Sequence, residues 1–172
     1  MKRFVPLLLL AALGFGPASA QVSALKGHNS NAPVDVAADR IEVQDRADRA
    51  IFSGNVVVRQ AQLTLTAARL TVAYSGGGGI ELRRIDATGG VTVRSPSETA
   101  RGNVAIYDLD RKIITLIGNV SLVQKDAKVN GGRLTIDLES GRAVMDGGGP
   151  PGTTSQGGRV TGTFTVPQKK GG

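Results

Sequence analysis

Side chains that perform acid, base or nucleophilic chemistry are scarce in this chain of 172 residues. It has one histidine, His28, and no cysteine. His28 lies in a polar, aperiodic stretch, so a Ser-His-Asp triad or a histidine metal site lacks its components. Asp108 and Asp110 are spaced like the paired carboxylates of glycoside hydrolases, but they precede a turn at Arg111-Lys112, which favours a solvated strand face. We therefore expect no enzyme, catalytic residue, cofactor or metal site.

Two further motif matches have simpler explanations. Gly147, Gly149 and Gly152 satisfy G-x-G-x-x-G, but Pro150-Pro151 interrupts the motif and no helical pattern follows, so the phosphate-binding helix N-terminus is missing. This segment is predicted to be a linker. Asn119 begins a glycosylation sequon, yet it belongs to a repeated Gly-Asn-Val element that has a structural explanation.

The first twenty residues have the pattern of a cleavable export signal. Lys2-Arg3 precede an apolar stretch from Phe4 to Phe15, and Ala18-Ser19-Ala20 form a small-residue cleavage site before Gln21. An uncleaved membrane anchor is less favoured, because a spanning helix needs roughly 20 apolar residues. About 150 residues then remain, which is enough for one domain.

Export and composition restrict the partners. The formal net charge is +7, and no aromatic residues are interleaved with the basic ones as in single-strand binders. We therefore expect no nucleic acid, and an anionic lipid or glycolipid is the favoured ligand. The absence of cysteine excludes a disulfide framework and thiolate metal sites.

The elements that position the remaining side chains are strands. Between Pro33 and Leu138 the apolar residues fall at every second position, which is typical of strands with one buried face. Turn residues separate these runs at 75–79, 89–90, 95–97, 131–132 and 147–151. Short strands without intervening helices predict an antiparallel all-β fold.

An internal repeat is visible when residues 50–75, 85–110 and 114–139 are aligned. Gly54, Gly89 and Gly118 coincide, and a valine follows each two residues later. Each unit reads as a strand pair, and Gly-Asn before the Val-rich strand favours a bend or bulge. Half units at 34–43 and 162–166 leave an unpaired edge at each end of the stack, which is available to another copy or to a chain of the same fold.

The apolar face is most simply a packed core, but thin aliphatic side chains also suit long acyl chains. Arg40, Arg69 and Arg133 recur at one repeat position beside this face. The simpler interpretation is that these arginines extend along a solvated strand face. The more specific alternative is that they hold phosphates of a lipid head group.

The order of these elements resembles the LptA/OstA-like periplasmic lipopolysaccharide-transport proteins of Gram-negative bacteria. The likeness spans about residues 33–166 and is carried by the signal followed by five segments: Pro33 to Arg40, Phe52 to Val56, Ala68 to Leu70, Arg101 to Asp108, and Leu116 to Val120. It implies an open, slightly twisted β-jellyroll or sandwich whose hydrophobic groove shields the acyl chains of lipid A. It also implies head-to-tail stacking between an inner-membrane anchored transport subunit and an outer-membrane translocon.

We therefore expect a signal peptide at 1–20, a flexible lead at 21–32, jellyroll repeats at 33–146, a linker at 147–158, a terminal strand at 159–166 and a disordered tail at 167–172. The expected function is a periplasmic lipopolysaccharide carrier that forms a bridge, with a structural scaffold that binds no lipid as the alternative. The expected lipid-binding residues are the inward apolar positions of every unit: Val34, Val36, Val56, Val58, Leu63, Leu65, Leu70, Val72, Val91, Val93, Tyr107, Leu109, Val120, Leu122, Leu134 and Ile136.

Overall fold

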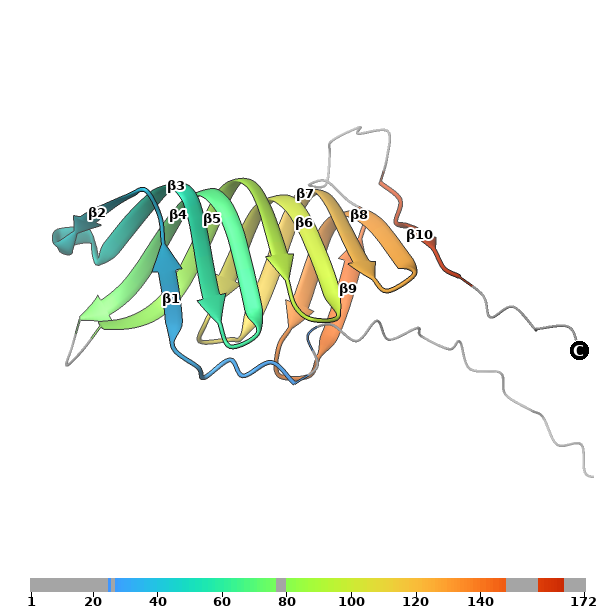
Figure 1. Ribbon diagram of the computed structural model, residues 1–172, viewed down its shortest axis with the longest axis horizontal. Coiled ribbons are helices and arrows are strands. Elements are labelled where there is room, and N and C mark those ends of the chain that lie inside the picture. Colours follow the sequence, from blue (N-terminus) through green and yellow to red (C-terminus); the bar gives the residue numbers. More distant parts are fainter. Residues whose placement is uncertain (1–24, 26, 77–79, 148–157, 166–172) are drawn as a thin grey trace, which may run out of the picture.

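The computed structural model describes residues 25, 27–76, 80–147 and 158–165, and within them ten strands form one antiparallel sheet (Figure 1). The expected signal peptide and C-terminal tail, and most of the expected linker, lie outside these residues. The strands are β1 (Val34–Ala37), β2 (Arg40–Gln44), β3 (Arg49–Gln60), β4 (Leu63–Gly76), β5 (Ile80–Arg94), β6 (Glu98–Asp108), β7 (Ile113–Gln124), β8 (Ala127–Asp137), β9 (Arg142–Asp146) and β10 (Thr161–Thr163). A short 3₁₀ helix, Asp45–Ala47, connects β2 to β3.

The long strands β3 to β8 form consecutive hairpins, and each strand bends so that the sheet folds into two layers (Figure 1). β1 and β10 pair with β3 and β8 on one side of the bend. β2 and β9 pair with the same two strands on the other side. We name these halves the β1 layer and the β2 layer. The predicted all-β, open antiparallel sandwich is confirmed, and the three repeat units are the hairpins β3–β4, β5–β6 and β7–β8.

The bend lies where the register shifts in every pair of neighbouring long strands. In β3, β5 and β7 two consecutive residues have positive φ, and Gly54-Asn55 and Gly118-Asn119 are two of these pairs. Glycine and asparagine tolerate this left-handed conformation better than other residues. The turns expected at 89–90 and 131–132 are wrong, because both glycine pairs lie inside strands, at the bends of β5 and β8.

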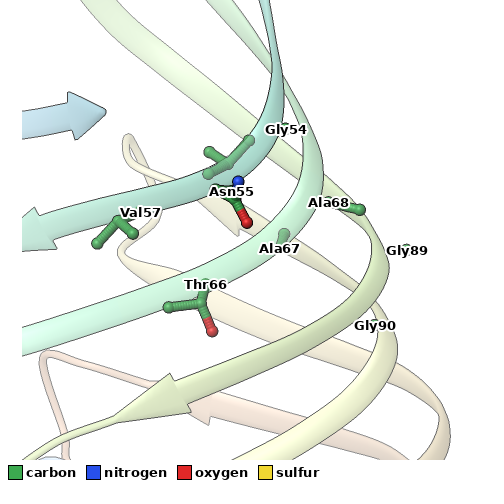
Figure 2. Close-up of a pocket in the computed structure, with 9 residues that line it drawn as sticks. Gly54, Asn55, Val57, Thr66, Ala67, Ala68, Gly89 and Gly90 are labelled. Atoms are coloured by element: carbon green, nitrogen blue, oxygen red, sulfur yellow. The ribbon is translucent and has the colours of Figure 1, made fainter. Parts of the chain in front are cut away.

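Neighbouring bends pack closely, which explains why glycine recurs there. A Cβ at Gly89 would lie 2.6 Å from the Cβ of Ala68, and a Cβ at Gly118 would lie 2.6 Å from Nδ2 of Asn103. Figure 2 shows Gly54, Ala68 and Gly89 on adjacent curved strands, around a shallow hollow that has no large side chain in its lining. Small residues are therefore stacked from strand to strand along the bend.

The core lies between the two layers. Its fully buried side chains come from both layers and form one continuous cluster: Val56, Leu70, Ile85, Val91, Ile114, Leu116, Val120, Leu134 and Ile136. Among the described residues, no helix has the length and apolar character needed to cross a membrane.

Candidate functional site

The apolar positions expected to bind lipid belong to this interior cluster. Thirteen of the sixteen are buried, and Val34, Val36 and Leu109 are partly buried and packed against them. In the middle of the molecule the two layers therefore fill the space between them with their own side chains. A groove that holds a ligand there requires the layers to separate.

The N-terminal end of the interior is open. A hollow of about 540 Å³ lies between β1, β2 and the adjacent ends of β3, β4 and β5. Ile41 of β2 is 57% exposed and Ile80 of β5 is 76% exposed, although both line it. The lining is almost entirely apolar: Val34, Val36, Ile41, Val43, Asp45, Ala50, Phe52, Val72, Tyr74, Ile80 and Leu82.

Sequence reasoning identified Val34, Val36 and Val72 but missed most of this lining. The alternation of Ile41 and Val43 was readable as part of a half unit, but nothing in a periodic pattern shows which inward positions lack a covering neighbour. Phe52 and Tyr74 are two of the few aromatic side chains and supply the broadest surfaces. Their place at one end of the stack is visible only in the fold.

Asp45 is the one charged residue of this lining, and it lies near the phenol of Tyr74. Desolvation raises the pKa of Tyr74, and the carboxylates of Asp45 and Asp48 add to the rise. The phenol is therefore neutral at physiological pH. The hollow as a whole offers dispersion contacts to an apolar ligand, with few directed polar groups.

The three arginines proposed for head groups lie in one row of the β2 layer, next to the bend. Arg40 and Arg69 flank Ser53, and Arg133 is in the same row on β8. Leu70 and Leu134 point into the core, so the adjacent arginines point outward, because successive side chains of a strand alternate. All three arginines are exposed and lie outside the interior.

A second basic row was missed in the sequence. Arg59 and Arg94 both lie opposite Thr64, and Lys128 is in the continuation of that row on β8. These residues are exposed on the outer face of the β1 layer, beside the hairpin turns where the two layers separate. Arg59 and Arg94 occupy the same position in the first two repeat units, but Val123 occupies it in the third unit and Lys128 lies on the return strand β8, so the sequence does not show the complete row.

The carboxylates considered for hydrolysis have structural roles at a turn. Asp108 accepts a hydrogen bond from the backbone N–H of Arg111 at 2.9 Å, and Asp110 pairs with Arg83 at 2.8 Å. Across the part of the chain that the structure describes, no three His, Cys, Asp or Glu side chains gather as a metal site would require.

A small polar cluster lies inside the open side, opposite the bend. Gln60 of β3 is 2% exposed, and its Oε1 accepts a hydrogen bond from the Tyr107 hydroxyl at 2.9 Å. Burial raises the pKa of Tyr107. Glu98, 6% exposed, accepts a hydrogen bond from the Leu25 N–H, and desolvation raises the pKa of its carboxyl group. Alternation alone gave no sign of these polar residues in an apolar interior.

Comparison with known structures gives the same fold. The structure of LptH from Pseudomonas aeruginosa, described as the LptA homologous periplasmic component of the lipopolysaccharide transport device, superimposes with a TM-score of 0.69. The match covers 80% of this chain and 98% of that one, at 19% sequence identity.

Sequence relatives extend the likeness. A protein of Rhizobium meliloti is 30% identical over 69% of this chain and 67% of its own length. The lipopolysaccharide export system protein LptA of Haemophilus influenzae is 25% identical over 80% of this chain and 83% of its own length. The LPS-assembly protein LptD of Yersinia enterocolitica is 31% identical over 67% of this chain, which corresponds to 16% of that longer protein.

The family model described as "LptA/(LptD N-terminal domain) LPS transport protein" matches residues 35–142, from β1 to the start of β9. This range contains all three hairpin units and both layers. The chain therefore belongs to the LptA/LptD N-terminal domain family of lipopolysaccharide transport proteins.

Proposed function

We propose that this protein is a non-enzymatic periplasmic carrier that shields the acyl chains of lipopolysaccharide between its two layers. The observation that carries the proposal is the apolar hollow at the N-terminal end, which continues into the row of aliphatic side chains between the layers. Burial of apolar surface contributes about 25 cal/mol per Å², so several acyl chains supply a large driving force.

The hollow is the point at which an acyl chain first leaves water. Val72 belongs both to the lining of the hollow and to the buried cluster, and Phe52 of the lining packs against that cluster. Because side chains fill the middle of the molecule, a longer stretch of lipid is accommodated only when the layers move apart. Each long strand runs through the bend from one layer to the other, so the backbone joins the layers there and separation occurs on the opposite, open side.

The proposed bridge forms by pairing of edge strands between copies or with related subunits. Among the described strands, β1 and β2 form the edges at one end, and β9 and β10 form the edges at the other. Unpaired strand edges readily pair with another chain. Both ends carry exposed apolar side chains, Ile41 and Val43 within β2 and Phe164 directly after β10. A head-to-tail contact would cover these side chains and make the hollow continuous with the next subunit.

For the phosphates of the head group, the basic residues beside the open side are the better candidates. Arg59, Arg94 and Lys128 lie near the hairpin turns, where a head group remains in water while its acyl chains lie between the layers. Arg40, Arg69 and Arg133 lie beside the bend, on the far side of the strands. We propose that the first row contacts phosphates more closely than the second.

Site-specific photo-crosslinking in intact cells tests the carrier function. A photoreactive residue is placed singly at Phe52 and Val36 in the hollow, and at Val93 and Tyr107 in the middle. Thr92 and Asp108 are the matched controls, because each neighbours an inward position and points to the outer face. We expect lipopolysaccharide adducts at the inward positions only, strongest at Phe52 and Val36.

The same experiment distinguishes the alternatives. Adducts at no position, in a protein shown to be folded and exported, would contradict the carrier function and favour a structural scaffold that binds no lipid. Adducts between protein chains from additional probes placed on β2 and β10, without lipid adducts at the inward positions, would support the scaffold directly.

A further inference from the structure

The segment before β1 runs along the open side of the molecule. In Figure 1 it is the blue trace below the lower ends of the strands, beneath the hairpin turns. We name Leu25 and the residues from Gly27 to Ala32 the strap. Leu25 and His28 line a small hollow of about 220 Å³ together with the turns that follow β3 and β5, at Gln62 and at 95–97. The flexible lead expected at 21–32 thus contains residues with specific contacts.

The strap is anchored at two points. The side chain of Leu25 is 5% exposed and belongs to the core cluster, and its N–H donates a hydrogen bond to Glu98. Farther along, Nε2 of Gln60 donates hydrogen bonds to the carbonyls of Ser30 and Ala32, both at 3.0 Å. An apolar anchor at one end and a polar anchor at the other fix the strap across the opening.

Gln60 also connects the strap to both layers. Its Oε1 accepts hydrogen bonds from Tyr107 at 2.9 Å and from Nε2 of His28 at 3.1 Å. Gln60 belongs to β3 in the β1 layer, and Tyr107 belongs to β6 in the β2 layer. Both donors and both acceptor sites of the Gln60 amide are used, so this buried side chain is fully hydrogen-bonded. It connects the strap, β3 and β6. The hydrogen bond between Tyr107 and Gln60 therefore connects the two layers at the open side.

We propose that the strap closes the groove of the unloaded protein and must leave before an acyl chain enters from the open side. This inference rests on the proposed lipid-carrier function. The side chain of Leu25 occupies the space that a lipid methyl end would take, and the Gln60 bridge holds the layers at the spacing of the closed state. Oε2 of Glu98 has no partner within the described residues, and departure of Leu25 exposes that carboxylate to water.

Loosening the strap tests this inference. Leu25→Ser is compared with the unchanged protein and with Asn29→Ala. The second variant removes the hydrogen bond that Oδ1 of Asn29 accepts from the N–H of Asn31, within the strap. Binding of purified lipopolysaccharide and of the apolar dye N-phenyl-1-naphthylamine is measured. We expect Leu25→Ser to bind both about tenfold more tightly, because removal of one buried leucine contact makes the open state more populated. Asn29→Ala is expected to behave as the unchanged protein.

Fixing the strap gives the opposite test. The chain has no cysteine, so His28→Cys with Gln62→Cys supplies one pair of thiols that line the same small hollow. A bifunctional thiol reagent joins them. The substitution of His28 removes its hydrogen bond to Gln60, but the contacts of Leu25 with Glu98 and of Gln60 with Ser30, Ala32 and Tyr107 are retained. We expect binding of lipopolysaccharide and dye to fall about tenfold after crosslinking, relative to the same protein before it.

The outcomes separate this inference from the carrier function. Tighter binding of the dye by Leu25→Ser, without lipopolysaccharide binding by any variant, would support the strap and contradict the carrier function. Equal lipopolysaccharide binding by the unchanged protein, by Leu25→Ser and by the crosslinked protein would support the carrier function and overturn the inference that the strap closes the groove. Absence of dye binding in all variants would also overturn the strap, since the interior then stays closed without it.

Discussion

The middle of the interior and its N-terminal end are built from the same alternating pattern, but only the end is open. In the middle, Leu116 and Leu134 are 0% exposed, whereas at the end Ile41 is 57% exposed. Among the described strands, each unit in the middle is covered by a unit on both sides, and the N-terminal end has a neighbour on one side only. The hollow therefore lies where the described stack of strands ends, and its inward side chains are not covered by a further described strand.

The largest effect is expected from a cavity in the middle. Leu116→Ala removes a fully buried side chain from the centre of the cluster, and substitutions of this kind reduce the free energy of unfolding by about 2–5 kcal/mol. Urea denaturation measures the loss. Ile41→Ala at the open end is the matched control, with an expected change below about 0.5 kcal/mol. Equal losses at both positions would contradict the distinction between a filled middle and an open end.

A smaller loss is expected from crowding the bend. Gly118 has a φ of +81°, and a Cβ there would lie 2.6 Å from Nδ2 of Asn103. Gly118→Ala is expected to reduce the free energy of unfolding by about 1–3 kcal/mol, because it combines strain with a close contact. Gly76→Ala serves as the control, since a Cβ there meets no atom within 4 Å. Thermal or urea unfolding of the two variants distinguishes the bend from an ordinary strand end.

The buried carboxyl at the open side should make stability depend on pH. Desolvation raises the pKa of Glu98. A group whose pKa is higher in the folded state contributes stability below its unfolded pKa, near 4.3 for glutamate, and this contribution is lost as the pH rises through the folded value. Glu98→Gln removes this titration and should gain stability relative to the unchanged protein between pH 4 and pH 7, by about 1 kcal/mol.

Urea denaturation of both proteins at a series of pH values measures this difference. Glu42→Gln is the control, because Glu42 is exposed on β2. A difference between Glu98→Gln and the unchanged protein that stays constant with pH would show that Glu98 is as well solvated as Glu42.

The smallest effect on stability is expected at the hollow, where binding should respond instead. Ile41→Ser combined with Ile80→Ser changes two exposed side chains of its lining. The free energy of unfolding should change by less than about 0.5 kcal/mol, while binding of lipopolysaccharide weakens several-fold because apolar contacts are lost. Glu42→Ser, on the outer face of the same strand, is the control. Loss of stability without loss of binding would place the ligand elsewhere.

Much of the fold follows from the sequence, because its signals are periodic. The alternation predicted strands, and the alignment of Gly54, Gly89 and Gly118 predicted the three hairpins and the bulges. Gly89-Gly90 and Gly131-Gly132 were misread as turns, because glycine pairs mark hairpin loops and strand bends alike. The two-layer arrangement distinguishes these cases only when both halves of one strand are seen to pair.

The candidate site is less predictable, because it depends on what is missing or aperiodic. Leu25 is a single leucine in a polar stretch, and no periodic pattern of apolar residues around it predicts that it is buried. Gln60 reads as an ordinary residue at a strand end, although it is among the most buried polar side chains. The open end likewise follows from the absence of a neighbour, which no individual residue encodes.

The pairing scheme also has a consequence for how the molecule comes apart. Each strand pairs with one that lies within two elements of it in the chain, from β1 on β3 to β10 on β8. Contacts that are local in sequence favour rapid formation, and a linear array can open one unit at a time. Local unfolding can therefore start at one end of the sheet and stop at the next intact hairpin. A terminal unit can then pair its edge strand with a neighbouring molecule while the remaining hairpins stay folded.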